Sequence, residues 1–224
     1  LSEFDKSACQ TLTHNRPEWN VVEGDVAKID FKEFQGKVDL LEGGFPCQAF
    51  SYAGKGRGFE DIRGTLFYEF ARALSEAMPK VAVGENVKGL IKHDNGRTLQ
   101  TMIETIKSIR DSNGIGYKVA WKLLRSQYLD VAQKRERLVL IAVREDIFEG
   151  SILFPKERDY FLSLRDVISD VPDGPGQQYA PSKKKIMDLI PAGGYWRDLP
   201  IDLQKEYLKG SFHLSGGKTG MARR

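Results

Sequence analysis

The feature of this sequence that most constrains its fold is an alternation, from Leu1 to about Arg144, of short apolar runs with longer amphipathic stretches. The runs Val38–Leu41 and Val81–Val83 are too short for helices and are typical of buried strands. Two further strands are expected at Tyr117–Leu124 and Leu138–Val143. Strands that alternate with helices predict an α/β domain with a mainly parallel sheet.

Stretches with helical periodicity accompany these runs. Helices are expected at Asp5–Asn15, Thr65–Met78 and Arg97–Arg110. In the last two, apolar residues recur every three or four positions, which places them on one face of the helix. The predicted core-facing residues are Leu66, Phe70, Ala73 and Leu74 in one helix, and Leu99, Met102, Ile103 and Ile106 in the other.

The character of the chain changes after about Phe154. Pro172–Gly176 is a run of turn-forming residues that interrupts any regular element. Beyond it, short helical stretches such as Leu199–Lys209 lie between glycine-rich turns. We therefore expect one domain over residues 1–154 and the start of a second, smaller lobe over residues 155–224.

The net charge of the 224-residue chain is only +3, but it is spread unevenly. From Lys183 to Arg224 there are nine Lys or Arg and four Asp or Glu, while the preceding residues carry 25 basic and 27 acidic groups. The basic tail is the surface that would meet a polyanion such as nucleic acid. Because basic solvated faces are common, charge alone does not establish such a partner.

The cysteine and histidine content excludes several classes of protein. Two cysteines, Cys9 and Cys47, form neither a disulfide framework nor a CxxC pair. This content fits a reducing compartment, and no apolar run or leader indicates a membrane protein, so a cytoplasmic location is expected. The three histidines lack metal-ligand spacing. A zinc deaminase would need a second thiol after Pro46-Cys47, and a cysteine hydrolase would need a histidine partner that no local motif supplies.

Three polar clusters are expected where strands end or begin. They are Gly44–Gln48, Glu85–Val87 and Gln133–Arg137. In open α/β sheets, ligands bind outside the carboxyl ends of the strands. The thiol of Cys47, the carboxylate of Glu85 and the guanidinium groups of Arg135 and Arg137 are therefore expected to converge.

That set of groups suits methylation of cytosine at C5, which is a poor nucleophile. A thiolate that adds at C6 turns C5 into an enamine carbon able to attack an electrophilic methyl group. A carboxyl group at N3 and an arginine at O2 would activate the ring. Covalent catalysis of this kind divides one difficult step into easier ones, and neighbouring arginines favour the thiolate.

The ordered motifs resemble the DNA cytosine-5 methyltransferase family. The residues that carry the resemblance are Ser2–Lys6, Gly24–Val26, Gly44–Ser51, Gly58–Phe67, Glu85–Val87 and Gln133–Arg137. They occupy about two-thirds of the chain, from Leu1 to about Arg144. The resemblance implies a Rossmann-like methyltransferase sheet, S-adenosylmethionine as cofactor, duplex DNA as substrate, and a role in a bacterial restriction-modification system near the nucleoid.

The resemblance also implies roles for individual residues. The catalytic set is Cys47 as nucleophile, Glu85 at cytosine N3, Arg137 at O2, Arg135 as an ordering and phosphate-contacting group, and Asn86 as a brace for the Pro46-Cys47 turn. The cofactor set is Glu3, Phe4, Asp25, Val26, Phe45 and Leu66. The DNA-binding set is Gln48, Ser51, Lys55 and Arg57. Residues 155–224 would begin the target-recognition region, which reads bases in the major groove.

The chain departs from the family pattern at both ends. It begins just after the family's first strand and its Phe-x-Gly-x-Gly turn, and it stops before the Gly-Asn segment that completes the cofactor site. We therefore expect this chain alone neither to fold stably nor to transfer methyl groups without flanking segments or a second polypeptide.

Other interpretations of these residues remain. Cys47 and Cys9 are buried core thiols in the simplest reading, Glu3 and Asp25 ordinary surface acids, Glu85 a cap on its turn, and the two arginines partners in surface ion pairs. For Cys9, core packing is the favoured reading. Two other functions also remain: a tRNA cytosine-5 methyltransferase, and a non-catalytic fragment that binds DNA.

Overall fold

The computed structural model covers residues 1–224 and describes all of them except residues 46–65, 173, 175–179, 192–193 and 209–224. The chain divides into two compact units, Leu1–Ser169 and Asp170–Arg224. The predicted division by function, into residues 1–154 and 155–224, differs from this division by compactness and stays a prediction.

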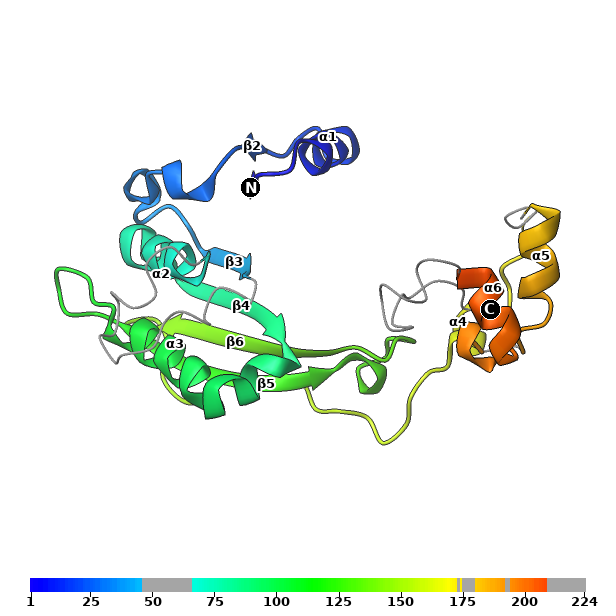
Figure 1. The fold of residues 1–224 in the computed structure, drawn as a ribbon. Helices are drawn as coiled ribbons and strands as arrows, with labels where there is room; N and C mark the ends of the chain where they lie inside the picture. Colours follow the sequence, from blue (N-terminus) through cyan, green and yellow to red (C-terminus); the bar gives the residue numbers. More distant parts are fainter. Residues whose placement is uncertain (46–65, 173, 175–179, 192–193, 209–224) are drawn as a thin grey trace. The chain divides into compact units, whose positions relative to one another are not determined.

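The first unit is built on a mixed four-stranded sheet (Figure 1). Its strands are β3 (Leu40–Gly44), β4 (Val81–Val87), β5 (Tyr117–Arg125) and β6 (Glu136–Arg144), in the order β3-β4-β6-β5. β3 and β4 are parallel, but β6 is antiparallel to both β4 and β5. β3, β4 and β5 therefore run in the same direction, as the prediction of a mainly parallel sheet requires, and β6 alone is reversed. The ten residues between β5 and β6, which include the short helix η6 (Ser126–Tyr128), are too few for a parallel crossover, so β6 returns antiparallel.

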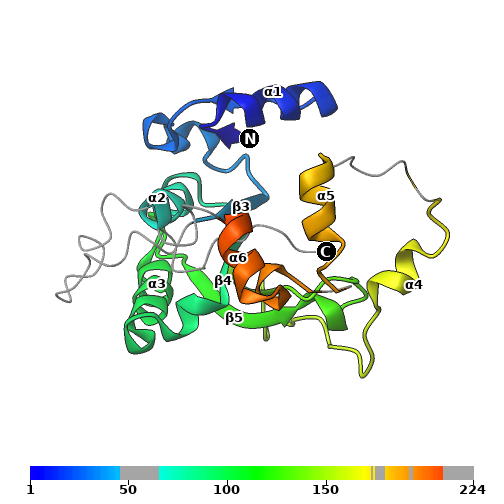
Figure 2. The same ribbon diagram turned by 45° about the vertical axis from the view of Figure 1, so that its right-hand side comes forward.

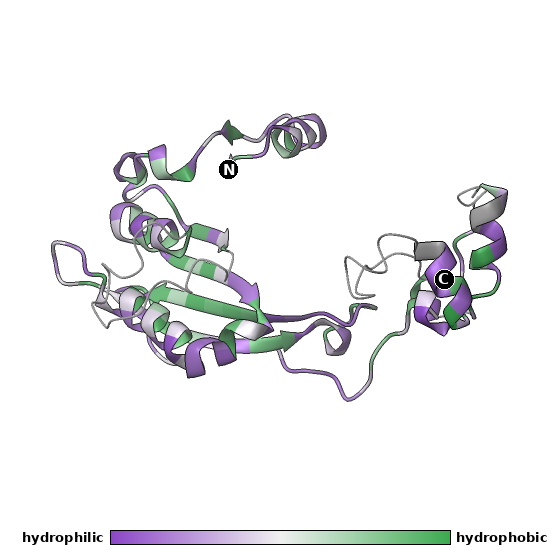
Figure 3. Ribbon diagram, in the orientation of Figure 1, coloured by the Kyte–Doolittle hydropathy of each residue, from purple (hydrophilic) through white to green (hydrophobic). Residues whose placement is uncertain are grey.

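Helices α2 (Leu66–Ala77) and α3 (Arg97–Ser108) cover one face of this sheet (Figures 1 and 2). The core between them contains Ala82 of β4 and alternate residues of β6, which is the period expected of a strand with one buried face. Hydrophobic residues run along β6 and the first part of β4 (Figure 3). The predicted inward faces are confirmed for Leu99, Met102 and Ile106, which are buried. Leu66 is instead exposed and its neighbour Phe67 is buried, so the predicted face is wrong at that end of α2.

Two glycines in register let aromatic rings approach the sheet. Gly43 of β3 lies opposite Gly84 of β4. A Cβ atom on Gly43 would lie 2.8 Å from the ring of Phe70, and one on Gly84 would lie 3.3 Å from the ring of Phe45. Any side chain at Gly43 would therefore displace the core at the end of β3.

The N-terminal part of the first unit forms a small parallel pair, β1 (Ser2–Glu3) and β2 (Val22–Glu23), with α1 (Lys6–Asn15) between them. Asp5 caps α1 by accepting a hydrogen bond from the Ala8 amide at 2.8 Å. Cys9 is buried and its thiol donates to the carbonyl of Glu3, as core packing requires. Burial also raises the pKa of this thiol. Within the described ranges, β3 pairs with β4 on one edge and with no strand on the other.

Three short helices connect the strands and helices above. They are η1 (Val26–Lys28), η2 (Phe31–Phe34) and η5 (Lys88–Gly96). The first two lie between β2 and β3, and the third joins β4 to α3. Asp25 and Asp30 cap η1 and η2 with their carboxylates.

Residues 148–160, called the strap here, follow β6 without regular structure and are tied by side chains to β5 and the turn after it. Arg125 pairs with Glu157, and Arg158 pairs with Asp130 at 3.1 Å. The Tyr160 hydroxyl donates to the same Asp130 carboxylate at 2.9 Å. These contacts keep the strap in the first unit, which ends after α4 (Leu164–Ile168).

The second unit contains α5 (Pro181–Met187), η7 (Trp196–Asp198) and α6 (Ile201–Leu208). Its small core consists of Met187, Ile190 and Leu199, with Ile186 and Leu203 packed against them. The helix predicted from Leu199 to Lys209 is confirmed over Ile201–Leu208. No helix in the part of the chain that the structure describes is long and apolar enough to cross a membrane.

Candidate active site

The polar residues singled out from the sequence gather at one edge of the sheet. The carboxyl ends of β3 and β4 and the amino end of β6 meet there, because Gly44 lies in register with Glu85 and Val87 with Arg137. Glu85 and Asn86 were expected to follow their strand, and Arg137 to precede its own. Both expectations are wrong, since pairing between β4 and β6 extends through all three residues.

Glu85 lies between two arginines. Its Oε1 atom is 2.7 Å from Nε of Arg137 and 3.6 Å from Nη2 of Arg135. Glu85 is opposite Val139 in the antiparallel ladder, so Arg137 is its diagonal neighbour on the same face. The predicted convergence of the carboxylate with both guanidinium groups is thus confirmed.

This cluster is open to solvent and carries a net positive charge. The side chains of Glu85, Arg137 and Arg135 are 39%, 28% and 48% exposed. One carboxylate cannot neutralise two guanidinium groups, and Arg135 approaches it only loosely. The cluster therefore retains donors for a ligand that carries hydrogen-bond acceptors.

A second ion pair holds the start of β6 from the neighbouring position. Nζ of Lys88 lies 2.8 Å from Oε2 of Glu136 and thereby connects the end of β4 to the first residue of β6. Glu136 lies between the two arginines in sequence, so its side chain points to the opposite face of the strand. This contact helps to fix the register that brings Arg137 beside Glu85.

Asn86 anchors the chain as it leaves β3. Its side chain is buried, with 2% exposure, and its Nδ2 atom donates to the carbonyl of Phe45 at 2.6 Å. The Phe45 ring packs in the core, 5.2 Å from the Phe67 ring and 5.4 Å from the Phe70 ring, centre to centre. The chain is therefore held by backbone and side chain at Phe45, beside Glu85 and one residue before Pro46. Five predicted site residues lie outside the described residues: Cys47, Gln48, Ser51, Lys55 and Arg57.

The predicted cofactor residues gather at the carboxyl ends of β1 and β2. The amide of Gly24 donates to the carbonyl of Glu3 at 2.9 Å, which brings the Glu3 and Asp25 segments together. One oxygen of Glu3 accepts the amides of Phe4 and Asp5, and one oxygen of Asp25 accepts the amide of Ala27. Within the described ranges, no group donates to the second oxygen of either carboxylate. Phe4 is exposed at the same strand end.

The remaining two cofactor predictions differ in their surroundings. Phe45 lies in the core, whereas Leu66 is exposed at the first residue of α2.

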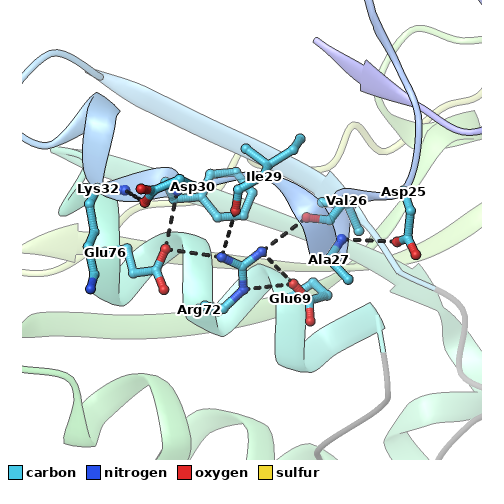
Figure 4. A network of polar contacts seen from close by, with 10 residues as sticks. Asp25, Val26, Ala27, Ile29, Asp30, Lys32, Glu69, Arg72 and Glu76 are labelled. Carbon is cyan, nitrogen blue, oxygen red and sulfur yellow. Dashed lines mark hydrogen bonds and ion pairs between the residues drawn. The ribbon is translucent and has the colours of Figure 1, made fainter.

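The structure also brings in a residue that sequence reasoning missed. Arg72 of α2 donates to the carbonyl of Val26, one of the predicted cofactor residues (Figure 4). The charge pattern Glu69-Arg72-Glu76 at helical spacing was the available signal.

No group of three or more metal-ligating side chains occurs among the residues the structure describes.

Comparison with known proteins shows which family this chain resembles over most of its length. Residues 1–192 match the family described as C-5 cytosine-specific DNA methylase. The chain is 54% identical over its full length to the Type II methyltransferase M.Eco47II of Escherichia coli, and 50% identical to M.PspPI of a Psychrobacter strain. It spans about half the length of these relatives, 54% and 55% respectively.

Solved structures give the same fold at much lower identity. A mutant of DNMT2 from Spodoptera frugiperda aligns with a TM-score of 0.57 and 19% identity, over 85% of this chain and 57% of that protein. The predicted Rossmann-like methyltransferase fold is therefore confirmed, with the mixed sheet described above.

Proposed function

Because this chain belongs to the C-5 cytosine-specific DNA methylase family, we propose that the protein transfers a methyl group from S-adenosylmethionine to C5 of a cytosine in duplex DNA. The observation that carries the proposal is the cluster at the β4–β6 edge. Glu85 is held there by Arg137 and Arg135, next to a chain that Asn86 anchors two residues before Cys47.

Cys47 and two groups of the cluster, Glu85 and Arg137, have distinct parts in the proposed reaction. The thiolate of Cys47 forms a bond to C6, and the electron pair displaced from the ring is stabilised as Glu85 hydrogen-bonds at N3. Arg137 donates to O2 and also orients Glu85. C5 then forms its bond to the methyl carbon as the bond from that carbon to the sulfonium sulfur breaks, and the sulfur leaves as a neutral thioether. C5 loses its proton to a base, and the ring double bond forms again as the bond from Cys47 to C6 breaks.

The carboxyl ends of β1 and β2 fit the cofactor. Two carboxylates with an unused oxygen each and an exposed aromatic ring suit a ribose diol, an adenine amine and an adenine face. Glu3, Asp25 and Phe4 would hold these parts, with Val26, Phe45 and Leu66 beside them. When bound there, S-adenosylmethionine supplies the electrophilic methyl group.

The DNA-facing part of the proposal concerns residues outside the described ranges. Gln48, Ser51, Lys55 and Arg57 would contact the duplex around a cytosine that has left the base stack, because only a flipped base exposes C6 to a thiol. Residues 155–224 would begin the target-recognition region. The curated relatives are named Type II methyltransferases and come from bacteria, which supports a role in restriction-modification at the bacterial nucleoid.

Covalent trapping tests the proposed function. Full-length protein incubated with cofactor and duplex DNA that carries 5-fluorocytosine at the target should form an adduct that survives denaturation, because the fluorine cannot leave as a proton. Cys47→Ser should abolish the adduct. Cys9→Ser is the matched control and should retain it, since Cys9 is a buried residue of α1 whose thiol donates to the carbonyl of Glu3.

An adduct that persists in Cys47→Ser would overturn the assignment of the nucleophile. Offering tRNA beside duplex DNA in the same assay separates the proposal from a tRNA cytosine-5 methyltransferase. A full-length protein that binds DNA and forms no adduct with either substrate would favour a non-catalytic role.

A further inference from the structure

Arg72 makes four hydrogen bonds and two ion pairs inside the protein. Its Nε and Nη2 atoms lie 2.8 and 2.7 Å from Oε2 of Glu69, and its Nη1 atom lies 3.0 Å from Oε2 of Glu76. The two Nη atoms also donate to the carbonyls of Ile29 and Val26, at 2.8 and 3.0 Å. A guanidinium group has five N–H donors, and four of them are used in these hydrogen bonds.

The two carbonyls belong to the turn that orients Asp25. The Asp25 carboxylate caps η1 by accepting the amide of Ala27, and the carbonyl of Val26 accepts the amide of Ile29 as well as Arg72. Arg72 therefore holds both ends of the single turn that follows Asp25 (Figure 4). Movement of that turn away from α2 would break both contacts at once.

Phe31 adds a third point of attachment. Its ring lies under the guanidinium of Arg72, with the Cζ atom 4.7 Å from the ring centre, a cation–π geometry. Its amide donates to Oε2 of Glu76 at 3.2 Å. The segment from Val26 to Phe31 thus contacts α2 through two carbonyls, one amide and one ring.

The helix that carries Arg72 is itself rigidly held. Its opposite side contributes Phe67, Phe70, Ala71 and Leu74 to the core, each nearly or fully buried. The Arg72, Glu69 and Glu76 side chains are 16%, 13% and 21% exposed, so water competes little for these contacts. The sheet-bound helix therefore provides a fixed reference for the position of Asp25.

We propose that Arg72 is a positioning residue for the adenine end of the S-adenosylmethionine site. It holds the Asp25–Ile29 turn in its binding shape before the cofactor arrives, an inference that rests on the proposed function. Arg72 reduces the loss of conformational entropy on cofactor binding, because a turn that is already ordered need not be ordered by the ligand. Arg72 does not touch the reacting atoms.

The test compares three variants of the full-length protein. Arg72→Met removes the donors and both ion pairs, and leaves Glu76 with the Phe31 amide as its donor. The triple variant Glu69→Gln, Arg72→Met, Glu76→Gln removes the two negative charges as well. It should therefore restore the stability of α2, but it does not restore the contacts between α2 and the turn. Arg72→Lys keeps the charge but supplies only three donors, from one atom.

Equilibrium binding and kinetics are measured for each variant. Dissociation constants for S-adenosylmethionine and for adenosine should rise by the same factor, about tenfold for each residue of the turn that the ligand must order. KM for the cofactor should rise while kcat stays nearly unchanged, since the lost interaction serves ground state and transition state alike. Arg72→Lys should lie between wild type and Arg72→Met, and affinity for DNA should not change.

The triple variant separates positioning from general stability. If Arg72 positions the turn, the melting temperature recovers in this variant while the affinity for both ligands stays weak. Recovery of affinity together with melting temperature would overturn the inference, as would an affinity for adenosine that is unaffected in all variants. Failure of the wild-type protein to bind S-adenosylmethionine at all would instead overturn the proposed function.

Discussion

Two clusters of arginine and carboxylate in this protein have opposite compositions and opposite environments. At the β4–β6 edge, one carboxylate, Glu85, lies between two arginines and is 39% exposed. On α2, one arginine, Arg72, lies between two carboxylates and is 16% exposed. The first cluster keeps unused donors, whereas the guanidinium of the second donates four hydrogen bonds within the protein.

The difference indicates what each cluster does. A buried charged group must find its partners within the protein, because isolation from water is costly unless it is paired and hydrogen-bonded. The Arg72 cluster meets that requirement and so holds structure. The side chains of the Glu85 cluster are more exposed to water, and some of their hydrogen-bond donors have no partner in the protein. Because water can satisfy these donors, the cluster costs little stability, and a cytosine base can replace that water. Substitutions in the two clusters should therefore affect different properties.

The largest expected effect is that of Glu85→Gln on the rate of transfer. The amide keeps the size and hydrogen bonding of the side chain but cannot share a proton with cytosine N3. General acid–base groups contribute about 10²–10⁴-fold to a rate, and kcat should fall within that range. Single-turnover methyl transfer to duplex DNA measures it.

The comparison also requires that Glu85→Gln leave stability almost unchanged, since the cluster is open to water. Glu104→Gln, on the solvent-facing side of α3, is the matched control and should change neither rate nor stability. Full activity in Glu85→Gln would remove Glu85 from the mechanism.

The reverse pattern is expected for Arg72→Met. Removal of one partner from a buried ion pair typically costs 3–5 kcal/mol, and the partial exposure here suggests about 3 kcal/mol. Urea unfolding of the full-length protein measures this free energy. Arg97→Met removes an exposed pair with Asp94 and should cost less than about 1 kcal/mol, as surface pairs do. Equal losses from both substitutions would contradict the distinction between closed and open clusters.

The smallest effect concerns the strap, whose ion pairs are exposed. Hydrogen bonds from Tyr160 and Arg158 lower the pKa of Asp130, and a hydrogen bond from Arg125 lowers the pKa of Glu157. A carboxylate whose pKa is lowered by folding stabilises the folded state above its unfolded pKa of about 4, and this contribution is lost as the pH falls through the lower folded value. The strap should therefore loosen below about pH 4.

Hydrogen exchange from pH 6 to pH 3 measures this loosening, corrected for the intrinsic exchange rate. Protection should fall in the strap before it falls in β4 and β6. Asp130→Asn should weaken protection at pH 6 and reduce its dependence on pH. A strap that keeps its protection down to pH 3 would show that these pairs contribute nothing to its attachment.

Local information was sufficient for much of the fold. The helix expected at Asp5–Asn15 begins at Lys6 with Asp5 as its cap, and α3 ends two residues before the expected Arg110. Periodicity and capping are properties of neighbouring residues, so they can be read without knowledge of the tertiary structure. The alternation of Arg135 and Arg137 likewise predicted that both would face one side of an extended segment, and both lie beside Glu85.

What the sequence determined by itself was therefore the four strands of the main sheet, the helices α1, α2, α3 and α6, and the chemical groups that they carry. Only the tertiary structure decided that β6 runs antiparallel, that β4 continues through Glu85 and Asn86, and that Phe67 rather than Leu66 faces the core. It also decided the partners of Arg72, whose carbonyl contacts lie 43 and 46 residues away in the sequence. The physical reason is that a strand's direction and a buried donor's acceptor depend on which distant segment lies beside them, and no local pattern specifies that neighbour.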